Sequence, residues 1–525
     1  MPDVGPPLTA QDEVFRLLAD PETHALDPGE TVRRIDTHAA VVFLAGDLVF
    51  KVKRTVKYPF LDYSTLAKRE AACRAELEVN HNFAPQLYRR VVPITREAPG
   101  ALTLDGTGET VEWAVEMQRF DENKTLDRLA ERGRLSDTLT RKLATAVAAM
   151  HARAKPFDPQ TWIGAIEGFL ADNTAAFKAH NGSHSELFAG HLVDLLAQKS
   201  QSALSRLRPL LVARGAQNLI RRGHGDLHLG NVAILDGEPV AFDALEFDPV
   251  FAAGDVLYDL AFLLMDLLER GLQRAANEVL NGYFAAARRT EDCDGIAALP
   301  FFMSLRAAIR AKVTAARLAL AKTEDKDKIA RAAKNYFKLA LDLLTPVKPL
   351  VVTTGGLSGT GKSVLARSLA PSLPPVPGAL VFRSDVERKV LYGVAETDRL
   401  PPDAYDPKVT EEVYRILIDK TGRVARAGHS AIADAVFAQP HERAAIEQAA
   451  AAADALFHGL FLVADLPVRL SRVGGRGPDA SDADAAVAAK QEEIAVGNVA
   501  WEIIDASGAP EETLAQARGE IERRL

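Results

Sequence analysis

The segment HGDLHLGN, residues 224–231, places an aspartate and an asparagine five residues apart, with a glycine beside each. Phosphoryl transfer needs little covalent help from a protein, but it needs a base beside the incoming hydroxyl and oxygen ligands for Mg²⁺. Asp226 suits the base and Asn231 suits a metal ligand. A second metal carboxylate is then required, and the segment AFDALEFD supplies Asp243 after a short expected strand. These residues predict a magnesium-dependent phosphoryl-transfer site.

Such a site also needs a lysine on the α- and β-phosphates of the nucleotide and a helix glutamate that holds this lysine. The segment VFKVK offers Lys51 and Lys53, which strand alternation places on the same face. The next expected helix offers Glu70, Glu76 and Glu78. We favour Lys51 with Glu76 as the nucleotide-holding pair. The alternative is that these are ordinary solvated charges of a strand and a helix.

The segment GGLSGTGKS, residues 355–363, is a phosphate-binding loop of a different kind. From Gly356 to Ser363 it fits the pattern G-x-x-x-x-G-K-S between an expected strand and an expected helix. Its backbone N–H groups can close on phosphate oxygens, and the helix start favours their negative charge. Lys362 would reach the β- and γ-phosphates, and the Ser363 hydroxyl would bind Mg²⁺. The nucleotide-binding residues expected here are Gly356, Ser358, Gly359, Thr360, Gly361, Lys362 and Ser363.

Residues that could act on an acceptor follow this loop. In VFRSDVERK, Asp385 and Arg388 are three residues apart and therefore share a helix face. Asp385 could orient or deprotonate a hydroxyl, and Arg388 could hold a phosphate or another anion of the substrate. Helix capping by Ser384 or Asp385 is the alternative, and both roles are compatible. Asp434 ends the apolar stretch AIAD, where a water-mediated Mg²⁺ ligand would lie; a purely structural role is an equal alternative.

A later segment, VRLSRVGGRGPDASDAD, carries arginines beside glycines. A mobile lid that places arginine on the transferred phosphate would have this composition, and a solvated basic loop is the alternative. The arginines are Arg469, Arg472 and Arg476, of which we expect Arg472 and Arg476 to act in catalysis.

The elements that must position the first set of residues form a β-rich segment followed by a helical one. The run AAVVFLAGDLVFKVK predicts a hairpin with a Gly-Asp turn, and residues 64–82 predict a helix with Ser64 as a plausible cap. Further strands are expected at 87–94 and 111–120. From residue 126 to 344 the chain is mainly helical, with short strands at VAILDG and PVAFDA. This pattern predicts a small β-rich lobe, about 30–120, and a helical lobe, about 121–346.

The pattern changes after the expected linker PVKP at 346–349. The apolar strands LVVTTGG, ALVFRSD, HSAIADAVF and GLFLVADL alternate with helical stretches, which predicts a parallel sheet covered on both faces. The expected fold class is therefore α/β and α+β, in two domains. The first spans 1–346, and the second, 347–525, is a three-layer α/β/α P-loop domain with a mainly parallel sheet.

The order of lysine, helix glutamate, HGDLHLGN, FDALEFD and GDVLYDLAFL resembles the aminoglycoside phosphotransferase and choline-kinase branch of the protein-kinase-like fold. The resemblance covers about residues 30–345 and implies a bilobal domain. It maps the family's HGDxxxxN loop onto residues 224–231 and its metal-binding aspartate onto Asp243, and it places Asp255 and Asp259 where the family has buried acids supporting that loop. The small lobe departs from the pattern, since LAGDLVF contains one glycine and no glycine-rich phosphate loop.

The second domain resembles the P-loop kinases that include polynucleotide kinase, zeta toxin, chloramphenicol phosphotransferase and gluconate kinase. The element S-D-x-x-R after the second strand carries most of this similarity. The whole order is similar to a bacterial group of fused aminoglycoside-phosphotransferase-like and ATP-binding proteins, over nearly the full chain.

The totals fit a protein of this kind and exclude several others. The chain has 525 residues, a net charge of -8 and two cysteines, which argues against a disulfide scaffold and favours a reducing, cytoplasmic setting. Its N-terminus has no signal-peptide pattern, and its apolar runs are too short to span a bilayer, so we expect no membrane association.

The patterns together predict an ATP-dependent phosphotransferase with two kinase-type sites, each using ATP and Mg²⁺ and a hydroxyl of a small molecule. One alternative is a polynucleotide 5′-end kinase in repair, although the acidic charge and the aromatic content of 6% argue against a nucleic-acid partner. Another is a P-loop domain that acts only as an ATP-gated switch on the first domain. The acceptors, the choice between ATP and GTP, the coupling of the sites and the oligomeric state stay open.

Overall fold

The computed structural model describes residues 10–58, 61–98, 100–181, 187–319, 321–475, 477 and 479–523. The chain folds into two compact units. One comprises Met1–Ala165 and Gly215–Leu263, and the other comprises Ile166–Arg214 and Leu264–Leu525. The domain boundary expected near residue 346 falls inside the second unit and stays a prediction. None of the described helices combines the length and the apolar character that crossing a bilayer requires.

A six-stranded antiparallel sheet begins the first unit, with strand order β1-β2-β3-β8-β6-β7. The predicted hairpin is confirmed, because β2 pairs with β3 and Ala45 lies opposite Leu48 across the Gly-Asp turn. The strands are β1 (Arg33–Asp36), β2 (Ala40–Ala45), β3 (Leu48–Lys53), β6 (Tyr88–Arg96), β7 (Leu102–Leu104) and β8 (Glu109–Gln118), and the short pair β4 (Lys57–Tyr58) and β5 (Leu61–Asp62) follows β3.

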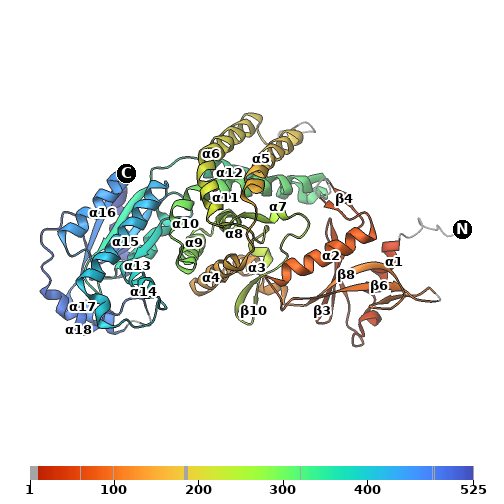
Figure 1. Cartoon of the computed structure of the whole chain (residues 1–525), viewed down its shortest axis with the longest axis horizontal. Helices are drawn as coiled ribbons and strands as arrows, with labels where there is room; N and C mark the ends of the chain where they lie inside the picture. The colour runs from red at the N-terminus through yellow and green to blue at the C-terminus, as the bar shows by residue number, and fades with distance from the viewer. Residues whose placement is uncertain are drawn as a thin grey trace. The chain divides into compact units, whose positions relative to one another are not determined.

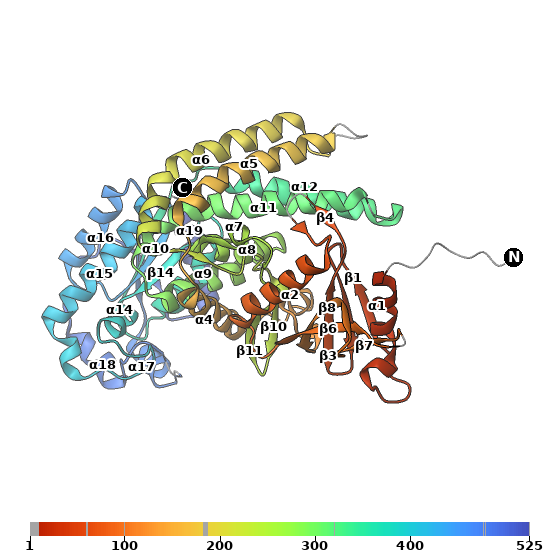
Figure 2. The ribbon, with the colours of Figure 1, turned by 45° about the vertical axis from the view of Figure 1, so that its right-hand side comes forward.

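The alternation of β3 decides where its lysines point. Phe50 and Val52 belong to the apolar cluster that contains residues of helix α1 (Ala10–Ala19). Val49 belongs to the cluster on the other face, with Cys73 of helix α2 (Leu66–His81). Lys51 and Lys53 share the face of Val49 because side chains alternate along a strand. Figure 2 shows α2 lying along the sheet near β6 and β8.

The helix predicted at 64–82 is confirmed, but its cap is different. Thr65, not Ser64, accepts the capping hydrogen bond, from the backbone N–H of Lys68 at 3.3 Å. Ser64 instead bonds the carboxylate of Asp62, at 2.5 Å from its hydroxyl. Ser64 therefore stabilises the turn before the helix, and Thr65 caps the helix.

The rest of the first unit is mainly helical, with two small β-pairs. The predicted strands at VAILDG and PVAFDA are confirmed as an antiparallel hairpin in which Val232 lies opposite Ala241. This register brings Asn231 beside Phe242, whose N–H donates to the Asn231 carbonyl at 2.9 Å. The elements are α3 (Leu126–Glu131), α4 (Asp137–Arg153), β9 (Ile220–Arg222), β10 (Val232–Leu235), β11 (Glu238–Ala241), α7 (Pro249–Ala252), β12 (Ala253–Asp255) and the first half of α8 (Val256–Glu269).

The second unit contains long helices and a five-stranded parallel sheet. The rings of Phe177 in α5, Phe337 in α12 and Phe188, two residues before the start of α6 at Gly190, pack against one another. The helices are α5 (Pro159–Asn181), α6 (Gly190–Ala216), α9 (Gln273–Ala287), α10 (Glu291–Gly295), α11 (Leu299–Ala316) and α12 (Thr323–Leu343). The helix expected at 323–345 is thus confirmed.

The parallel sheet has strand order β14-β15-β13-β16-β17, and every neighbouring pair is parallel. Helices α13 and α19 pack on one face and α15 and α16 on the other, so the predicted three-layer α/β/α arrangement is confirmed. Figure 1 shows α13, α15 and α16 beside this sheet. The strands are β13 (Leu350–Gly355), β14 (Leu380–Arg383), β15 (Ala431–Asp434), β16 (Leu456–Val463) and β17 (Glu502–Asp505). The helices are α13 (Lys362–Leu369), α14 (Ser384–Leu391), α15 (Pro407–Arg426), α16 (Pro440–Ala452), α17 (Leu466–Gly474), α18 (Ala485–Lys490) and α19 (Pro510–Glu522).

The edge strand β14 is covered by helix α9. Asn281 accepts a hydrogen bond from the Val381 N–H at 2.7 Å and donates to the Ala379 carbonyl at 3.1 Å. Asn277 donates to the same carbonyl at 3.0 Å. A helix that precedes the P-loop by many residues thus satisfies backbone groups that a sheet edge leaves unpaired.

Candidate active sites

The first site is built on the lysine face of β3. Glu76 is fully buried on α2 and lies between both lysines: one carboxylate oxygen is 2.8 Å from the Lys51 Nζ and the other is 2.6 Å from the Lys53 Nζ. The structure therefore brings Glu76 to Lys51 as expected, and to Lys53 as well. Glu70 instead bonds Arg74 on the exposed side of α2.

Each lysine has a second acidic partner in the segment after β11. Lys51 Nζ is 2.6 Å from the Asp243 carboxylate, and Lys53 Nζ contacts Glu246 at 2.5 Å. Asn80 of α2 is hydrogen-bonded to the backbone between Asp243 and Glu246. Its side-chain amide accepts from the Ala244 N–H at 2.8 Å and donates to the Ala244 carbonyl at 3.2 Å. Strand β3, helix α2 and the acidic segment are thus joined through charged and polar contacts.

The charges of this cluster support one another. Burial alone would lower the pKa of Lys51, but the carboxylates of Asp243 and Glu76 outweigh burial and raise it well above its usual value. Burial alone would raise the pKa of Glu76, but the two lysines outweigh burial and lower it. Both groups are therefore charged at neutral pH.

The loop HGDLHLGN is held against these elements. The Asn231 side chain donates to the backbone carbonyl of Asp226 at 3.0 Å and to its carboxylate at 3.1 Å. Buried Asp259 accepts from the N–H groups of His224, at 2.8 Å, and Gly225, at 2.9 Å. Asp259 thus supports the loop in the way the resemblance implies, and buried Asp255 accepts from the Leu257 N–H at the start of α8.

The donor set of this site suits magnesium. The Asn231 amide nitrogen makes the bonds to Asp226, which leaves its amide oxygen for a metal. The Asp243 side chain is 46% exposed and carries a carboxylate beside Lys51. Amide, carboxylate and phosphate oxygens are the ligands that Mg²⁺ prefers. Among the described residues, no three His, Cys, Asp or Glu side chains gather into a ready metal-binding group, so phosphate oxygens and water would complete the shell.

The second site starts at the loop between β13 and α13. Gly356, Gly359 and Gly361 have φ angles of 132°, 85° and 95°, which favour glycine. At Gly359 an added Cβ would lie 2.6 Å from the Arg469 carbonyl oxygen, so the loop and α17 meet closely there. Thr360 is buried, and its hydroxyl bonds the Leu357 carbonyl at 2.9 Å.

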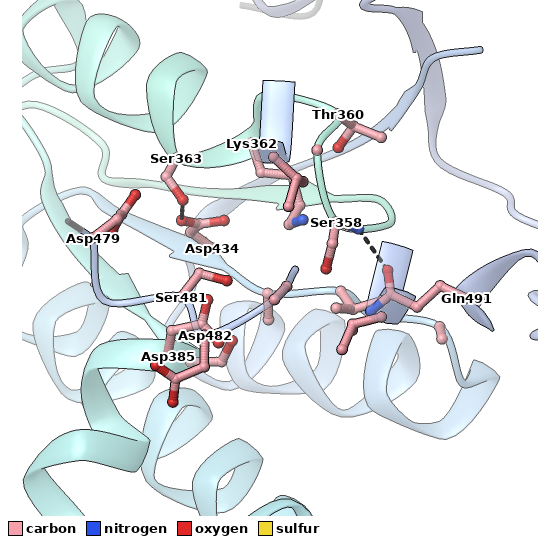
Figure 3. A pocket seen from close by; sticks show the side chains of 18 of the residues that line it. Ser358, Thr360, Lys362, Ser363, Asp385, Asp434, Asp479, Ser481, Asp482 and Gln491 are labelled. Atoms are coloured by element: carbon pink, nitrogen blue, oxygen red, sulfur yellow. Dashed lines mark hydrogen bonds between the residues drawn. The ribbon is translucent and has the colours of Figure 1, made fainter. Parts of the chain in front are cut away.

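The lysine and serine that end this loop face its interior. Lys362 Nζ donates to the Leu357 carbonyl at 3.0 Å, so it folds back over its own loop. The Ser363 hydroxyl lies 2.5 Å from the Asp434 carboxylate at the end of β15 (Figure 3). Burial lowers the pKa of Lys362, and Asp434 and Asp385 partly counteract it. Ser363 and Asp434 together form an oxygen pair that suits Mg²⁺.

Asp385 lies on the first turn of α14 and lines the same cavity as the loop. The Ser481 hydroxyl bonds its carboxylate, and Figure 3 shows the two side chains together. The capping alternative is not realised, because Arg383 is the N-cap residue and makes no side-chain cap bond. Asp385 is thus left to face the cavity.

The arginines have different surroundings. Arg388 is buried; it donates to the Ala404 carbonyl at 2.6 Å and stacks on the Tyr405 ring, 4.9 Å from its centroid. Arg472 lines the cavity and donates to the Ala506 and Gly508 carbonyls, both at 2.7 Å. Arg476 lies outside the described residues.

Arg469 is buried and holds the loop rather than an open lid. It donates to the Ser358 carbonyl at 2.9 Å and to the Ala488 carbonyl at 3.0 Å, and it pairs with Glu492. Ser358 itself donates its N–H to the Gln491 side chain at 2.7 Å. Helix α17 and the segment around Gln491 are therefore both bonded to the phosphate-binding loop.

One cavity of about 1390 Å³ joins these residues. Its wall contains the phosphate-binding loop on one side and Asp385, Arg388 and Tyr405 on another. A volume of this size exceeds that of most single-ligand pockets, which suits a nucleotide and a second molecule.

Several residues of these sites were not singled out by the sequence analysis. In the first site they are Tyr63, Asn80 and Glu246; in the second they are Asp479, Ser481, Asp482 and Gln491. Glu246 lies inside the segment quoted for Asp243, and Asp479, Ser481 and Asp482 lie inside the segment quoted for its arginines, so closer attention to the other residues of both segments would have found them. Gln491 lies far along the chain, and no local pattern indicates that it reaches Ser358.

Two family models match the chain. Residues 31–299, about half of the chain, match the phosphotransferase enzyme family, and residues 351–495 match an AAA domain. The fold and the two sites thus define a kinase-type protein, and the chain belongs to the phosphotransferase enzyme family.

Curated relatives extend over both domains. An uncharacterized protein of Mycobacterium tuberculosis (strain ATCC 25618 / H37Rv), Rv2004c, is 30% identical over 492 residues, which is 92% of this chain and 94% of the relative. An uncharacterized protein of Mycobacterium bovis matches with the same identity and coverage. The similarity to these relatives therefore extends into both of the regions that the family models match.

Solved structures resemble one part of the chain or the other. A choline/ethanolamine kinase family protein from Mesorhizobium loti is 15% identical, covering 64% of this chain and 99% of that chain, with a TM-score of 0.36. The Mycobacterium tuberculosis APS kinase CysC, in complex with AMPPNP and APS, is 21% identical, covering 34% of this chain and 98% of that chain, with a TM-score of 0.26. The chain's place in the phosphotransferase enzyme family rests on the family model that matches residues 31–299, not on these structures.

Proposed function

We propose that the chain carries two kinase-type sites, each of which transfers the γ-phosphate of ATP to a hydroxyl of a small molecule. The observation that supports this most is the single cavity lined by the phosphate-binding loop together with Asp385 and Arg388. A nucleotide switch without a substrate has no need of an acid and a buried arginine facing its phosphate site.

In the first site, Asp226 would accept the proton of the acceptor hydroxyl. Asn231 and Asp243 would bind magnesium, which when present neutralises charge on the phosphates. Lys51, held by Glu76 at 2.8 Å, would hold the α- and β-phosphates. The protein thus contributes position and charge rather than covalent chemistry.

In the second site, Lys362 would hold the β- and γ-phosphates, and Ser363 and Asp434 would hold magnesium. Asp385 would orient and deprotonate the acceptor hydroxyl. Arg388 would bind an anionic group of that acceptor, since the hydrogen-bond partners it has in the described part of the chain, Ala404 and Thr410, offer no carboxylate. Arg472 and Arg476 would act on the transferred phosphate.

A screen with labelled ATP and pooled metabolites tests this function. Wild-type protein is compared with Asp226→Ala and Lys362→Ala, and with the control variants Glu238→Ala and Lys348→Ala, whose side chains are 64% and 50% exposed. We expect two kinds of labelled product, one lost with each site variant and both kept by the controls.

Full transfer to every acceptor by Asp226→Ala would refute the mechanism of the first site. Retained transfer by Lys362→Ala would refute that of the second. If Lys362→Ala changed only the kinetics of the first site, the P-loop domain would be a regulatory domain instead.

A further inference from the structure

Lys51 and Lys53 share Glu76 in the first site. Besides Lys51, the buried cluster contains Lys53, Glu76, Glu246 and Tyr63. Lys53 contacts Glu76 at 2.6 Å and Glu246 at 2.5 Å. The Tyr63 hydroxyl donates to the same Glu246 carboxylate at 2.7 Å, and the Tyr63 ring lies 5.4 Å from the Lys53 Nζ. The nucleotide-holding role assigned to Lys51 accounts for none of these contacts.

The two lysines differ in accessibility. The Lys53 and Glu246 side chains are 4% and 9% exposed, whereas those of Lys51 and Asp243 are 17% and 46% exposed. Tyr63 is buried and covers the Lys53 pair. Lys53 is therefore shielded from any ligand that reaches Lys51 and Asp243.

The Lys51 contacts conflict with the proposed function in one respect. Lys51 Nζ is 2.6 Å from the Asp243 carboxylate, yet phosphate oxygens require this lysine and a metal requires this carboxylate. The contact between them must therefore weaken when nucleotide and metal bind. The segment that carries Asp243 then loses one of its attachments to β3.

We propose that Lys53, Glu246 and Tyr63 are positioning residues that keep the segment 243–246 attached to β3 and α2 when Lys51 leaves Asp243 for the nucleotide. This inference rests on the proposed function of the first site. Lys53 holds Glu76 from one side and Glu246 from the other, so it fixes both the partner of Lys51 and the backbone three residues after Asp243. Nothing in this buried pair has to change when ligands bind.

Measuring the loss of fold stability and the loss of magnesium affinity separately distinguishes a positioning role from a purely stabilising one. Removal of one member of a buried ion pair leaves an unpaired charge and destabilises the fold, whereas removal of both members is often tolerated. Partners that orient a metal ligand, by contrast, cost about 10- to 100-fold in metal affinity when removed. A neutral double variant should therefore regain stability without regaining magnesium affinity.

The experiment uses the full chain with Lys362→Ala, so that only the first site binds nucleotide. Calorimetric titration measures ATP binding with EDTA and with increasing MgCl₂, and thermal unfolding is followed in parallel. The variants are Lys53→Met, Glu246→Gln and the double variant, in which glutamine still accepts from Tyr63. The controls are Lys57→Met and Glu238→Gln, whose side chains are 74% and 64% exposed.

We expect both single variants to unfold at lower temperature and to need about 10- to 100-fold more Mg²⁺ for tight ATP binding. The double variant should recover the unfolding temperature and keep the raised Mg²⁺ requirement, while ATP affinity in EDTA stays near that of the parent. A double variant that recovers both would overturn the positioning role, as would single variants with an unchanged Mg²⁺ requirement. If the parent protein bound no ATP, the proposed function of the first site would fail instead.

Discussion

The groups around the carboxylate of Asp385 shift its pKa in opposite directions. Burial raises its pKa, Arg383 lowers it and the negative charge of Asp434 raises it again; the hydrogen bond from Ser481 lowers it. Arg383 is itself held between Asp434 and Asp479, at 3.3 Å and 2.8 Å. The base proposed for the second site must be ionised to accept a proton, so its action would depend on the arginine and serine around it.

Ser481→Ala should raise the pKa of Asp385 further, because the hydrogen bond that stabilises the ionised form is lost. The acid limb of the pH profile of kcat/KM at the second site should then move to higher pH. The profile is measured with an acceptor found in the metabolite screen. Ser471→Ala, on the exposed side of α17, is the control and should leave the profile unchanged; an unshifted profile for Ser481→Ala would remove this serine from the site.

Residue types were predictable where a motif fixes them and not where a distant segment supplies them. Lys362, Ser363 and Asp226 follow from local spacing, because the chemistry of phosphate and magnesium prescribes their order. Lys53 was ambiguous, since alternation places both lysines on one face and only the position of Glu246 distinguishes them.

At the scale of elements, the phosphate-binding loop is shaped by its contact with α17. Gly359 combines a φ of 85° with a backbone oxygen 2.6 Å from where a Cβ would lie. The oxygen cannot make room for a side chain without moving Arg469, which also bonds Ser358. Contacts within the chain therefore hold the loop in shape at this glycine.

Gly359→Ala should destabilise the second unit by about 1–3 kcal/mol, since the backbone conformation disfavours a side chain and the oxygen blocks it. ATP binding at this site should weaken by at least about tenfold, because the N–H groups of the loop lose their alignment. Calorimetry in a Lys51→Met background, which silences the first site, measures the binding. Gly474→Ala, which has open space around it, should change neither quantity, and equal behaviour of the two variants would contradict the argument.

The elements were predicted well where apolar periodicity is strong. The β2–β3 hairpin and the strands β13 to β16 follow from it. Strand β17 was missed because its sequence, EIID, is short and half polar, and its pairing with β16 comes from tertiary contact. The cap at Thr65 instead of Ser64 shows the same limit, since both residues can cap and only the backbone decides.

At the scale of the whole molecule, stability should depend on pH through a buried histidine. His429 is 1% exposed, its Nε2 lies 2.9 Å from the Gly378 carbonyl, and burial lowers its pKa to about 4. The imidazole therefore stays neutral in the folded state over a range in which it is protonated in the unfolded chain.

The folded state should thus be most stable above about pH 6.5, the ordinary pKa of histidine, and its free energy of unfolding should fall as the pH falls towards 4. This loss approaches about 3 kcal/mol, because the unfolded state binds a proton that the folded state excludes. Urea unfolding between pH 4.5 and 7.5 measures it. His429→Gln, which can still donate to Gly378, should show a flatter dependence; identical slopes in both proteins would contradict the assignment.

The hydrogen bonds between α9 and the edge strand β14 determine which shortened fragments of the chain would stay monomeric. A fragment that begins at residue 347 would lack Asn277 and Asn281 and would present the bare β14 backbone to solvent. Such edges recruit strands from other copies, so the fragment should self-associate even if its P-loop forms correctly. A cut that retains α9 would keep the protein dispersed in solution.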